Sequence, residues 1–198
     1  MSDPKHLDSS YVADAAYRDD EPDGKGAPSL LLTIVLAIVL TFFVRTFLID
    51  SYEIPSGSME QTIQVGDRLI AEKVSYRFRN PEPGEIVTFS FTEDGVTNIL
   101  IKRVIAVEGQ TVDLIDGVVY VDGVALDEPY TDGLPSYPLG GAENPISYPV
   151  TVPSGCIWVM GDNRTNSRDS RVIGPISVDD VTSRALFIFW PPADIGTI

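Results

Sequence analysis

The stretch Asn98-Ile-Leu-Ile-Lys-Arg-Val-Ile-Ala-Val107 is rich in β-branched residues and predicts a β-strand. Because side chains alternate between the two faces of a strand, Leu100, Lys102, Val104 and Ala106 share one face. An amine among these apolar side chains has two interpretations. It is either a buried lysine whose pKa is lowered by loss of solvation, or an edge-strand lysine whose ammonium reaches water. The stretch alone favours neither.

Five further stretches have the same character and are too short for helices. They are residues 68–74, 85–91, 117–121, 156–160 and 184–190, separated by Pro, Gly, Asn and Asp. Asp116-Gly117 and Asp122-Gly123 are dipeptides typical of hairpin turns. We therefore predict a mostly β fold of antiparallel strands, with a proline-rich, loop-rich excursion at about residues 122–154.

An apolar run of twenty residues extends from Leu30 to Ile49 and spans about 30 Å as a helix, the thickness of a bilayer core. Its one charge, Arg45, lies near the end, where a guanidinium reaches the headgroups. A cleaved secretory signal is the alternative, but the run exceeds the usual core of about 7–15 residues. We expect a single transmembrane anchor at 29–49, a disordered tail at 1–28, and one folded domain at 50–198.

The composition excludes several classes of function. A net charge of −15 argues against a nucleic-acid partner. The one cysteine, Cys156, excludes an internal disulfide, and its apolar neighbours favour a buried structural thiol. The one histidine, His6, lies in the tail, which leaves the folded domain without a Ser-His-Asp triad or a histidine metal site. We expect no metal and no cofactor.

The small polar turn Ile54-Pro-Ser-Gly-Ser-Met59 follows the apolar run closely. A nucleophilic serine there needs a base other than histidine, and lysine is the known alternative. The folded domain has two lysines, and Lys73 lies beside Glu72 in a less apolar stretch that favours a solvated side chain. If Ser58 is reactive, Lys102 is therefore the better partner.

The stretch Gly161-Asp-Asn-Arg-Thr-Asn-Ser-Arg-Asp-Ser-Arg171 alternates acidic, amide and basic side chains. Arg164 and Arg168 fall among the would-be ligands of a calcium loop and exclude it. A solvated surface loop is one interpretation, but a hydrogen-bonded scaffold around a site suits this density of charge better. The residues Asn163-Arg-Thr165 also match a glycosylation sequon, a pattern that is frequent by chance.

Four motifs together resemble the successive motifs of the type I signal peptidases, or leader peptidases. They follow the apolar run in the family's order and are Ser56-Gly-Ser-Met59, Gly66-Asp-Arg-Leu69, Lys102-Arg-Val-Ile-Ala106 and the loop 161–171. The resemblance implies an antiparallel β-sheet catalytic domain of signal-peptidase type. It also implies a serine endopeptidase that removes signal peptides from exported preproteins.

The resemblance further implies roles for single residues. Ser58 matches the nucleophile and Lys102 the general base that takes its proton. The backbone N–H of Ser58 and the hydroxyl of Ser56 match the donors of the oxyanion hole. Ser167 matches the serine whose hydroxyl orients the lysine amine.

Other residues match supporting positions of the family. The ion pairs that brace the site are matched by Asp162 with Arg103 and by Asp169 with Arg171. Signal peptidases cut after small residues, typically at Ala-x-Ala sites, so their pockets are shallow and apolar. The pocket walls are matched by Ile54, Ile63, Leu69 and Ile101, each of which also fits an ordinary core position.

The resemblance implies signal peptides of preproteins, the lipid bilayer and a protein-export channel as partners. It places the tail inside the cell and the catalytic domain on the extracytoplasmic side of the cell membrane, with the anchor crossing once. Substrate backbone is expected to bind as an added strand. Trp190 favours the membrane interface, whereas Phe187 and Phe189 are expected to be buried in the sheet.

Three residues depart from the family pattern without removing a catalytic group: Gln61, Gln110 and Thr165. Two hypotheses from other classes remain. A self-cleaving repressor shares the Ser-Lys dyad but needs a basic DNA-reading domain, which the acidic tail does not provide. The other is an anchored, non-enzymatic β module, in which Ser58 and Lys102 would have no catalytic role.

Overall fold

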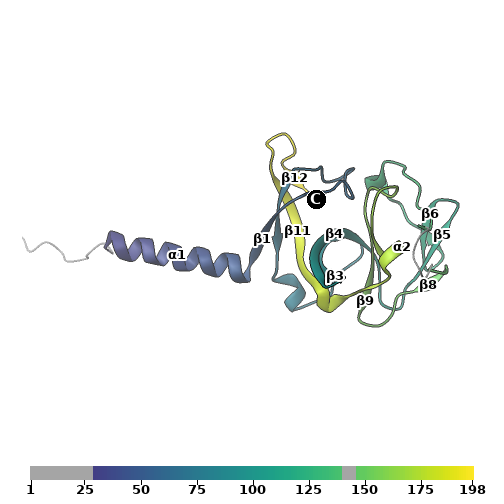
Figure 1. Cartoon of the computed structure of the whole chain (residues 1–198), viewed down its shortest axis with the longest axis horizontal. Coiled ribbons are helices and arrows are strands. Elements are labelled where there is room, and N and C mark those ends of the chain that lie inside the picture. The colour runs from purple at the N-terminus through teal and green to yellow at the C-terminus, as the bar shows by residue number, and fades with distance from the viewer. Residues whose placement is uncertain (1–28, 140–145) are drawn as a thin grey trace, which may run out of the picture. The chain divides into compact units, whose positions relative to one another are not determined.

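The computed structural model describes residues 29–139 and 146–198 and divides into two compact units, residues 1–38 and 39–198. The predicted disordered tail at 1–28 lies outside the described residues, as do residues 140–145 of the predicted excursion. The described part is one apolar helix followed by a β-rich domain (Figure 1).

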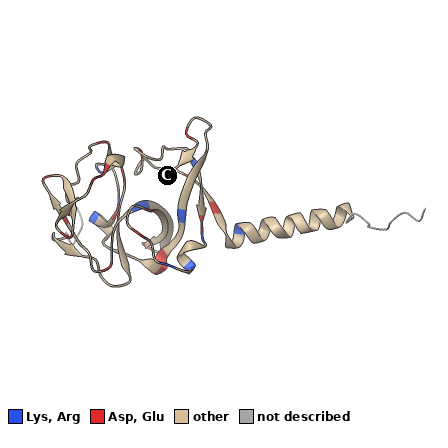
Figure 2. Ribbon diagram, turned by 180° about the vertical axis from the view of Figure 1, so that it is seen from behind, with Lys and Arg blue, Asp and Glu red and all other residues tan. Residues whose placement is uncertain are grey.

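Helix α1 spans Leu30–Phe47 and has a mean hydropathy of 2.5 with no buried residue. Within the described ranges it is the one helix long and apolar enough to cross a membrane. Its only charge is Arg45 in the last turn. In Figure 2 the helix is tan apart from one blue band near its end. The helix ends two residues before the predicted anchor does, because Ile49 instead begins strand β1 and pairs with Glu72.

The β-rich domain contains one large and one small sheet, and every strand pairing in them is antiparallel. The large sheet has the order β1-β2-β11-β3-β4-β9-β10, with β12 paired to β11. Its strands are β1 Ile49–Glu53, β2 Arg68–Glu72, β3 Ile86–Glu93, β4 Val96–Val107, β9 Cys156–Met160, β10 Ile176–Ser177, β11 Val181–Trp190 and β12 Gly196–Thr197. This arrangement confirms the predicted mostly β, antiparallel fold.

The small sheet has the order β7-β6-β5-β8 and lies beyond β9 in Figure 1. Its strands are β5 Thr111–Ile115, β6 Val118–Val121, β7 Val124–Ala125 and β8 Val150–Thr151. Asp116 and Gly117 join β5 to β6 with φ of 51° and 85°, the left-handed values that this kind of hairpin turn requires. The predicted hairpin is therefore present, and the excursion after it carries two short strands, β7 and β8.

The described residues also contain four short helices. They are the 3₁₀ helices η1 Ser75–Arg77, η2 Pro129–Thr131 and η3 Val178–Asp180, and the single α-helical turn α2 Ser170–Ile173. The side chain of Asp169 caps α2 by accepting a hydrogen bond from the backbone N–H of Arg171. The Asp169 carboxylate also accepts a hydrogen bond from the N–H of Gly161 at 3.0 Å, which links the two ends of the loop 161–171.

Strand β4 contributes to all three apolar clusters of the domain, because a bulge lies between Val104 and Ala106. Leu100 and Val104 face the cluster around Phe89, as period two predicts, but Ala106 lies in the cluster around Trp158. The expectation that Ala106 shares the face of Lys102 is therefore wrong. A bulge adds one residue to a strand and reverses the faces that follow it.

The expectation that Phe187 and Phe189 are buried in the sheet is also wrong. Their exposures are 38% and 37%, and Trp190 is 51% exposed. Strand β11 turns Ala185 and Ile188 to the core instead, and its pairing with β2 slips at two bulges. Cys156 is only half-buried, at the edge of the cluster around Trp158.

We expect Leu69→Ala to lower the free energy of unfolding by about 2–5 kcal/mol, because Leu69 is fully buried and its removal leaves a cavity. Val65→Ala, at a side chain that is 55% exposed, is the matched control and should change it by less than about 0.5 kcal/mol. Chemical denaturation measures both. Equal effects of the two variants would contradict the assignment of Leu69 to the core.

Candidate active site

The turn that carries Ser58 is tied to the core on both sides. Before it, Ile54 is buried and exchanges backbone hydrogen bonds with Asp67 and Gly66, each of 2.9 Å. After it, Met59 and Ile63 are fully buried, and the N–H of Ile63 donates to the carbonyl of Met59 at 2.7 Å. A polar serine between these apolar anchors has a fixed position.

The structure brings Ser58 and Lys102 together. The Lys102 amine lies 2.6 Å from Ser58 Oγ and 2.6 Å from the carbonyl oxygen of Ile101. Lys102 is 3% exposed and Ser58 is 8% exposed. The interpretation of Lys102 as an edge lysine that reaches water is thereby excluded.

Burial lowers the pKa of Lys102 from its ordinary 10.5 to about 8, because loss of solvation disfavours the ammonium. The carboxylates of Asp169 and Asp162 act in the opposite direction and raise the pKa, but they do not offset the burial. A substantial fraction of the Lys102 side chains is therefore neutral in slightly alkaline water.

Both predicted ion pairs are formed beside these two residues. Arg103 donates from Nε and Nη2 to the two carboxylate oxygens of Asp162, at 2.9 and 2.7 Å. Arg171 reaches Asp169 in the same two-pronged way, at 2.9 and 2.8 Å, and both of these side chains are fully buried. Two charge-assisted hydrogen bonds between one guanidinium and one carboxylate fix the relative orientation of the two side chains as well as the distance between them.

Ser167 lies in the predicted neighbourhood, but the hydrogen bond expected from it to Lys102 is absent. Its Oγ is buried without a partner in the described residues, whereas the Lys102 amine donates to Ile101. The Ser167 side chain packs against Gly161, where an added Cβ would collide with it and with the carbonyl of Ser58. The orienting role of Ser167 stays a prediction.

Two adjoining depressions open at the Ser58 turn. One, of about 210 Å³, is lined by Ser56, Gly57, Ser58, Leu100, Lys102, Asn166 and Arg168. The other, of about 40 Å³, is lined by Tyr52, Glu53, Ile54, Pro55, Thr88, Ile99, Leu100 and Ile101. Two of the four predicted pocket residues, Ile54 and Ile101, line the smaller depression. Ile63 and Leu69 lie in the core beneath Ile54 instead and reach neither depression.

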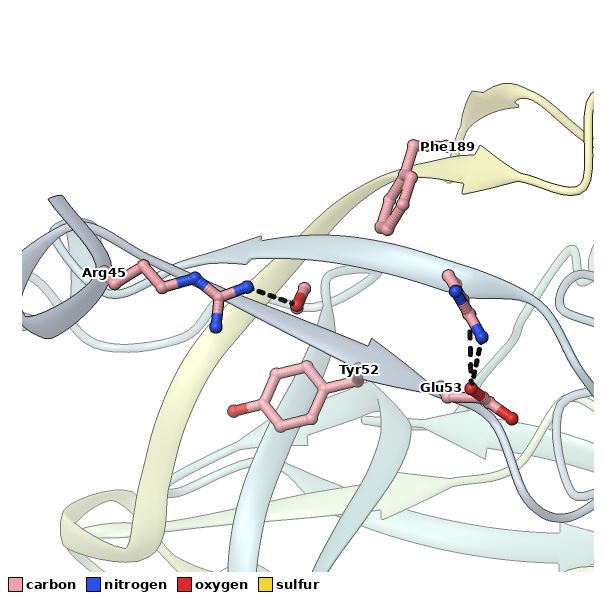
Figure 3. Close-up of a pocket in the computed structure, with 6 residues that line it drawn as sticks. Arg45, Tyr52, Glu53 and Phe189 are labelled. Atoms are coloured by element: carbon pink, nitrogen blue, oxygen red, sulfur yellow. Dashed lines mark hydrogen bonds and ion pairs between the residues drawn. The ribbon is translucent and has the colours of Figure 1, made fainter. Parts of the chain in front are cut away.

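A larger cavity of about 380 Å³ shares Tyr52 and Glu53 with the smaller depression but contains none of the predicted site residues. Its lining is Arg45, Ser51, Tyr52, Glu53, Arg68 and Phe189 (Figure 3). The Arg45 guanidinium donates to the Ser51 hydroxyl at 3.4 Å, and Arg68 forms an ion pair with Glu53 at 3.1 Å. Dashed lines at Arg45 and Glu53 in Figure 3 mark these interactions. Volume alone therefore does not single out a candidate site.

Comparison with known proteins identifies the family. The family model described as "Signal peptidase, peptidase S26" matches residues 28–190. The chain belongs to the signal peptidase family, peptidase S26. The membership of this family that the four motifs predicted is confirmed, and the chain is a serine peptidase, a hydrolase. The repressor and the non-enzymatic β module are thereby excluded.

Three relatives show the extent of the similarity. The probable signal peptidase I-2 of Synechocystis sp. is 38% identical over 193 residues, which cover 96% of this chain and 85% of that protein. The probable signal peptidase I-1 of the same organism is 41% identical over 177 residues, covering 86% and 84%. The signal peptidase I of Mycobacterium tuberculosis is 37% identical over 238 residues, covering 92% and 80%.

The structure adds residues that the sequence analysis did not assign to the site. Asn163 has a 7% exposed side chain whose amide donates to the carbonyl of Gly57, so it is a structural link and presents no open sequon. Asn166 and Arg168 line the depression at Ser58. Their place in the charged loop was the available signal, but the alternation of charges does not tell which of them face the cleft.

The three departures from the family pattern have no hydrogen bond to Ser58 or Lys102 in the described residues. Gln61 and Thr165 are exposed. Gln110 accepts a hydrogen bond from the N–H of Val107 through its side-chain oxygen and donates to Asp122.

We expect Lys102→Met to stabilise the protein below pH 8. There the buried ammonium is charged in both folded and unfolded chains, and the pKa change from 10.5 to about 8 corresponds to a cost of about 3 kcal/mol. Between pH 8 and 10.5 the folded lysine loses its proton first, so the wild-type chain regains stability and the advantage of the variant disappears.

Unfolding midpoints of the whole chain in detergent at pH 6.5 and pH 10.5 measure this difference. Lys73→Met is the control, because Lys73 is partly exposed in a 2.8 Å ion pair with Asp50. A Lys102→Met variant no more stable than wild type at pH 6.5 would contradict the burial of a lysine charge.

Proposed function

We propose that this chain is a membrane-anchored endopeptidase that removes signal peptides from exported preproteins, with Ser58 as nucleophile and Lys102 as general base. The observation that carries the proposal is the buried amine, 2.6 Å from the serine hydroxyl oxygen. The one histidine of the chain is His6, far outside the folded domain in sequence, so the lysine is the base within reach.

The proposed reaction begins with a neutral Lys102 amine, which accepts the proton of Ser58 as Oγ attacks the scissile carbonyl. The backbone N–H of Ser58 and the hydroxyl of Ser56 stabilise the oxyanion that develops, and Ser56 lines the same depression. The Lys102 ammonium then protonates the leaving amine. It next accepts a proton from the water that hydrolyses the acyl-enzyme and releases Ser58.

Substrate binding follows from a free strand edge. In the described residues, β9 pairs with β4 only from Arg103 onward, so residues 96–101 of β4 have a strand partner on one side only. An extended peptide can add itself along this edge, and backbone hydrogen bonds then bring the scissile bond to Ser58.

The smaller depression accounts for a preference for small side chains. It lies between this strand edge and the segment 52–55, and about 40 Å³ accommodates a methyl group but no large side chain. Ile54 and Ile101 supply branched walls that exclude larger residues. We therefore infer cleavage after Ala-x-Ala sequences. Ile63 and Leu69 act only from beneath, by supporting Ile54.

The two ion pairs brace the dyad. Arg103 follows Lys102 directly and holds Asp162, while Asp169 accepts a hydrogen bond from the N–H of Gly161, at 3.0 Å. The buried hydroxyl of Ser167 has no hydrogen-bond partner in the described residues, and we propose that it accepts a hydrogen bond from the Lys102 amine once substrate binds. These residues shape the site and do not touch the reacting bond.

The membrane helix gives the proposal its place in the cell. Only ten residues lie between Phe47 and Ser58, and α1 is apolar enough to span a bilayer. We propose that α1, Leu30–Phe47, crosses the membrane once and that the catalytic domain, which begins with β1 at Ile49, lies on the extracytoplasmic side. A signal peptide released by an export channel into the same bilayer then meets the enzyme at a raised effective concentration.

We expect Ser58→Ala and Lys102→Ala each to abolish cleavage of a preprotein with an Ala-x-Ala site, with losses of about 10³-fold or more in kcat. Cleavage is measured by gel on the purified full-length protein. Ser154→Ala and Lys73→Ala are the controls, because neither residue borders the depressions at Ser58. Near-normal turnover by Lys102→Ala would overturn the dyad.

We also expect kcat/KM to rise with pH through about 8, because the base is the neutral form of Lys102 and its pKa is lowered to that value. Initial rates on a peptide with an Ala-x-Ala site between about pH 6 and pH 10 measure the profile. A rate independent of pH over this range would exclude a titrating lysine base.

A further inference from the structure

The segment of residues 126–137, here called the clasp, lies in the loop-rich excursion and matches no family motif, yet it is joined to the loop 161–171 by buried charge. Arg164 has no exposed side-chain surface and donates from Nη2 and Nη1 to the two carboxylate oxygens of Glu128, at 2.6 and 2.8 Å. Its Nη1 also donates to Ser136 Oγ at 2.6 Å, and its Nε to the carbonyl of Gly161 at 2.9 Å.

Tyr130 extends the clasp to the strand that carries Lys102. Its hydroxyl donates to Glu128 Oε1 at 2.8 Å, and the centre of its ring lies 4.0 Å from the guanidinium carbon of Arg103. A guanidinium at this distance is attracted by the face of the ring. Arg103 follows Lys102 in the chain and forms an ion pair with Asp162. The Tyr130 ring therefore packs against an ion pair that is next to the proposed base.

The loop held by Arg164 in turn holds the turn of Ser58. The N–H of Asn163 donates to the carbonyl of Ser58 at 3.1 Å, and its side-chain amide donates to the carbonyl of Gly57 at 2.9 Å. The clasp is therefore linked to Lys102 through Tyr130 and Arg103, and to Ser58 through Glu128, Arg164 and the loop.

We propose that Glu128 and Tyr130 are positioning residues that hold Ser58 and Lys102 at reacting distance. This inference rests on the proposed Ser58–Lys102 dyad. It assigns a task to a segment outside the family motifs, and neither residue borders the depressions where substrate binds. The clasp acts on geometry, because a displacement of about 1 Å in a reacting group costs about 10²-fold in rate.

The clasp also acts on charge. Lys102 faces the carboxylates of Asp162 and Asp169, which favour its ammonium, and each carboxylate is paired with an arginine, Arg103 and Arg171. Arg168 lines the same depression from the loop. If the Tyr130 ring is removed, Arg103 is held less firmly against Asp162, and the carboxylate favours the ammonium more strongly. The pKa of Lys102 should then rise.

Kinetics on an Ala-x-Ala peptide test the geometric part with two matched pairs of variants. We expect Tyr130→Ala to lower kcat about ten-fold or more while KM changes by less than about two-fold. Tyr130→Phe keeps the aromatic ring and should retain most of the wild-type kcat. We expect Glu128→Gln to lower kcat as well. Asp127→Asn removes the same charge one residue earlier, at an exposed side chain, and should match wild type.

Titration of Lys102 by NMR, with ¹³C-labelled lysine in the intact chain in micelles, tests the inference without any cleavage. The Lys102 amine should titrate at the same pH in wild type and in Tyr130→Phe. In Tyr130→Ala it should titrate at a higher pH. Failure of wild type to cleave the peptide would refute the proposed function alone. Wild-type kcat and an unchanged Lys102 pKa in Tyr130→Ala would overturn the clasp. If Tyr130→Ala does not fold, the comparison of Glu128→Gln with Asp127→Asn tests the proposal instead. The same kcat and the same Lys102 pKa in these two variants would overturn the positioning role of the clasp.

Discussion

Removal of the Lys102 amine from water is the physical constraint on which the rest of the structure depends. Burial outweighs two nearby carboxylates that act in the opposite direction, and the net result is a pKa of about 8. The Lys102 amine is 3% exposed and lies against the Ser58 turn, with Ser58 Oγ and the Ile101 carbonyl as its hydrogen-bond partners. Lys102 directly precedes the part of β4 that pairs with β9, and residues 96–101 before it have a strand partner on one side only. The buried lysine therefore adjoins a strand edge that is free for a peptide.

A buried amine beside a polar turn requires a framework of paired charges around it. Arg103, Arg164 and Arg171 are each buried, and each has a carboxylate partner, Asp162, Glu128 and Asp169. A buried charge without its partner costs several kcal/mol, so every arginine in this framework needs a carboxylate within reach. Two partners come from the loop 161–171 itself. The third, Glu128, comes from the excursion. The ion pair between Glu128 and Arg164 therefore explains why the excursion packs against the loop 161–171.

The strands and their turns are largely predictable from the sequence because their causes are local. Alternation of apolar residues, Asp-Gly dipeptides at left-handed positions and an uninterrupted apolar run each act within a few residues. They predicted the antiparallel strands, the β5–β6 hairpin and the apolar helix. The errors lie where a distant contact decides: Ile49 joins β1 because β2 pairs with it, a bulge turns Ala106 to another cluster, and the slipped pairing of β11 exposes Phe187 and Phe189.

For the site, the sequence by itself determined which chemistry was available: one histidine outside the folded domain, two lysines within it, and a serine in a polar turn. The tertiary structure decided which groups meet. It placed Lys102 beside Ser58, moved Ile63 and Leu69 into the core, left Ser167 without a partner, and joined Glu128 to Arg164 across 36 residues. The physical reason is that residue type limits what a side chain can do, whereas burial and pairing depend on contacts between segments far apart in the chain.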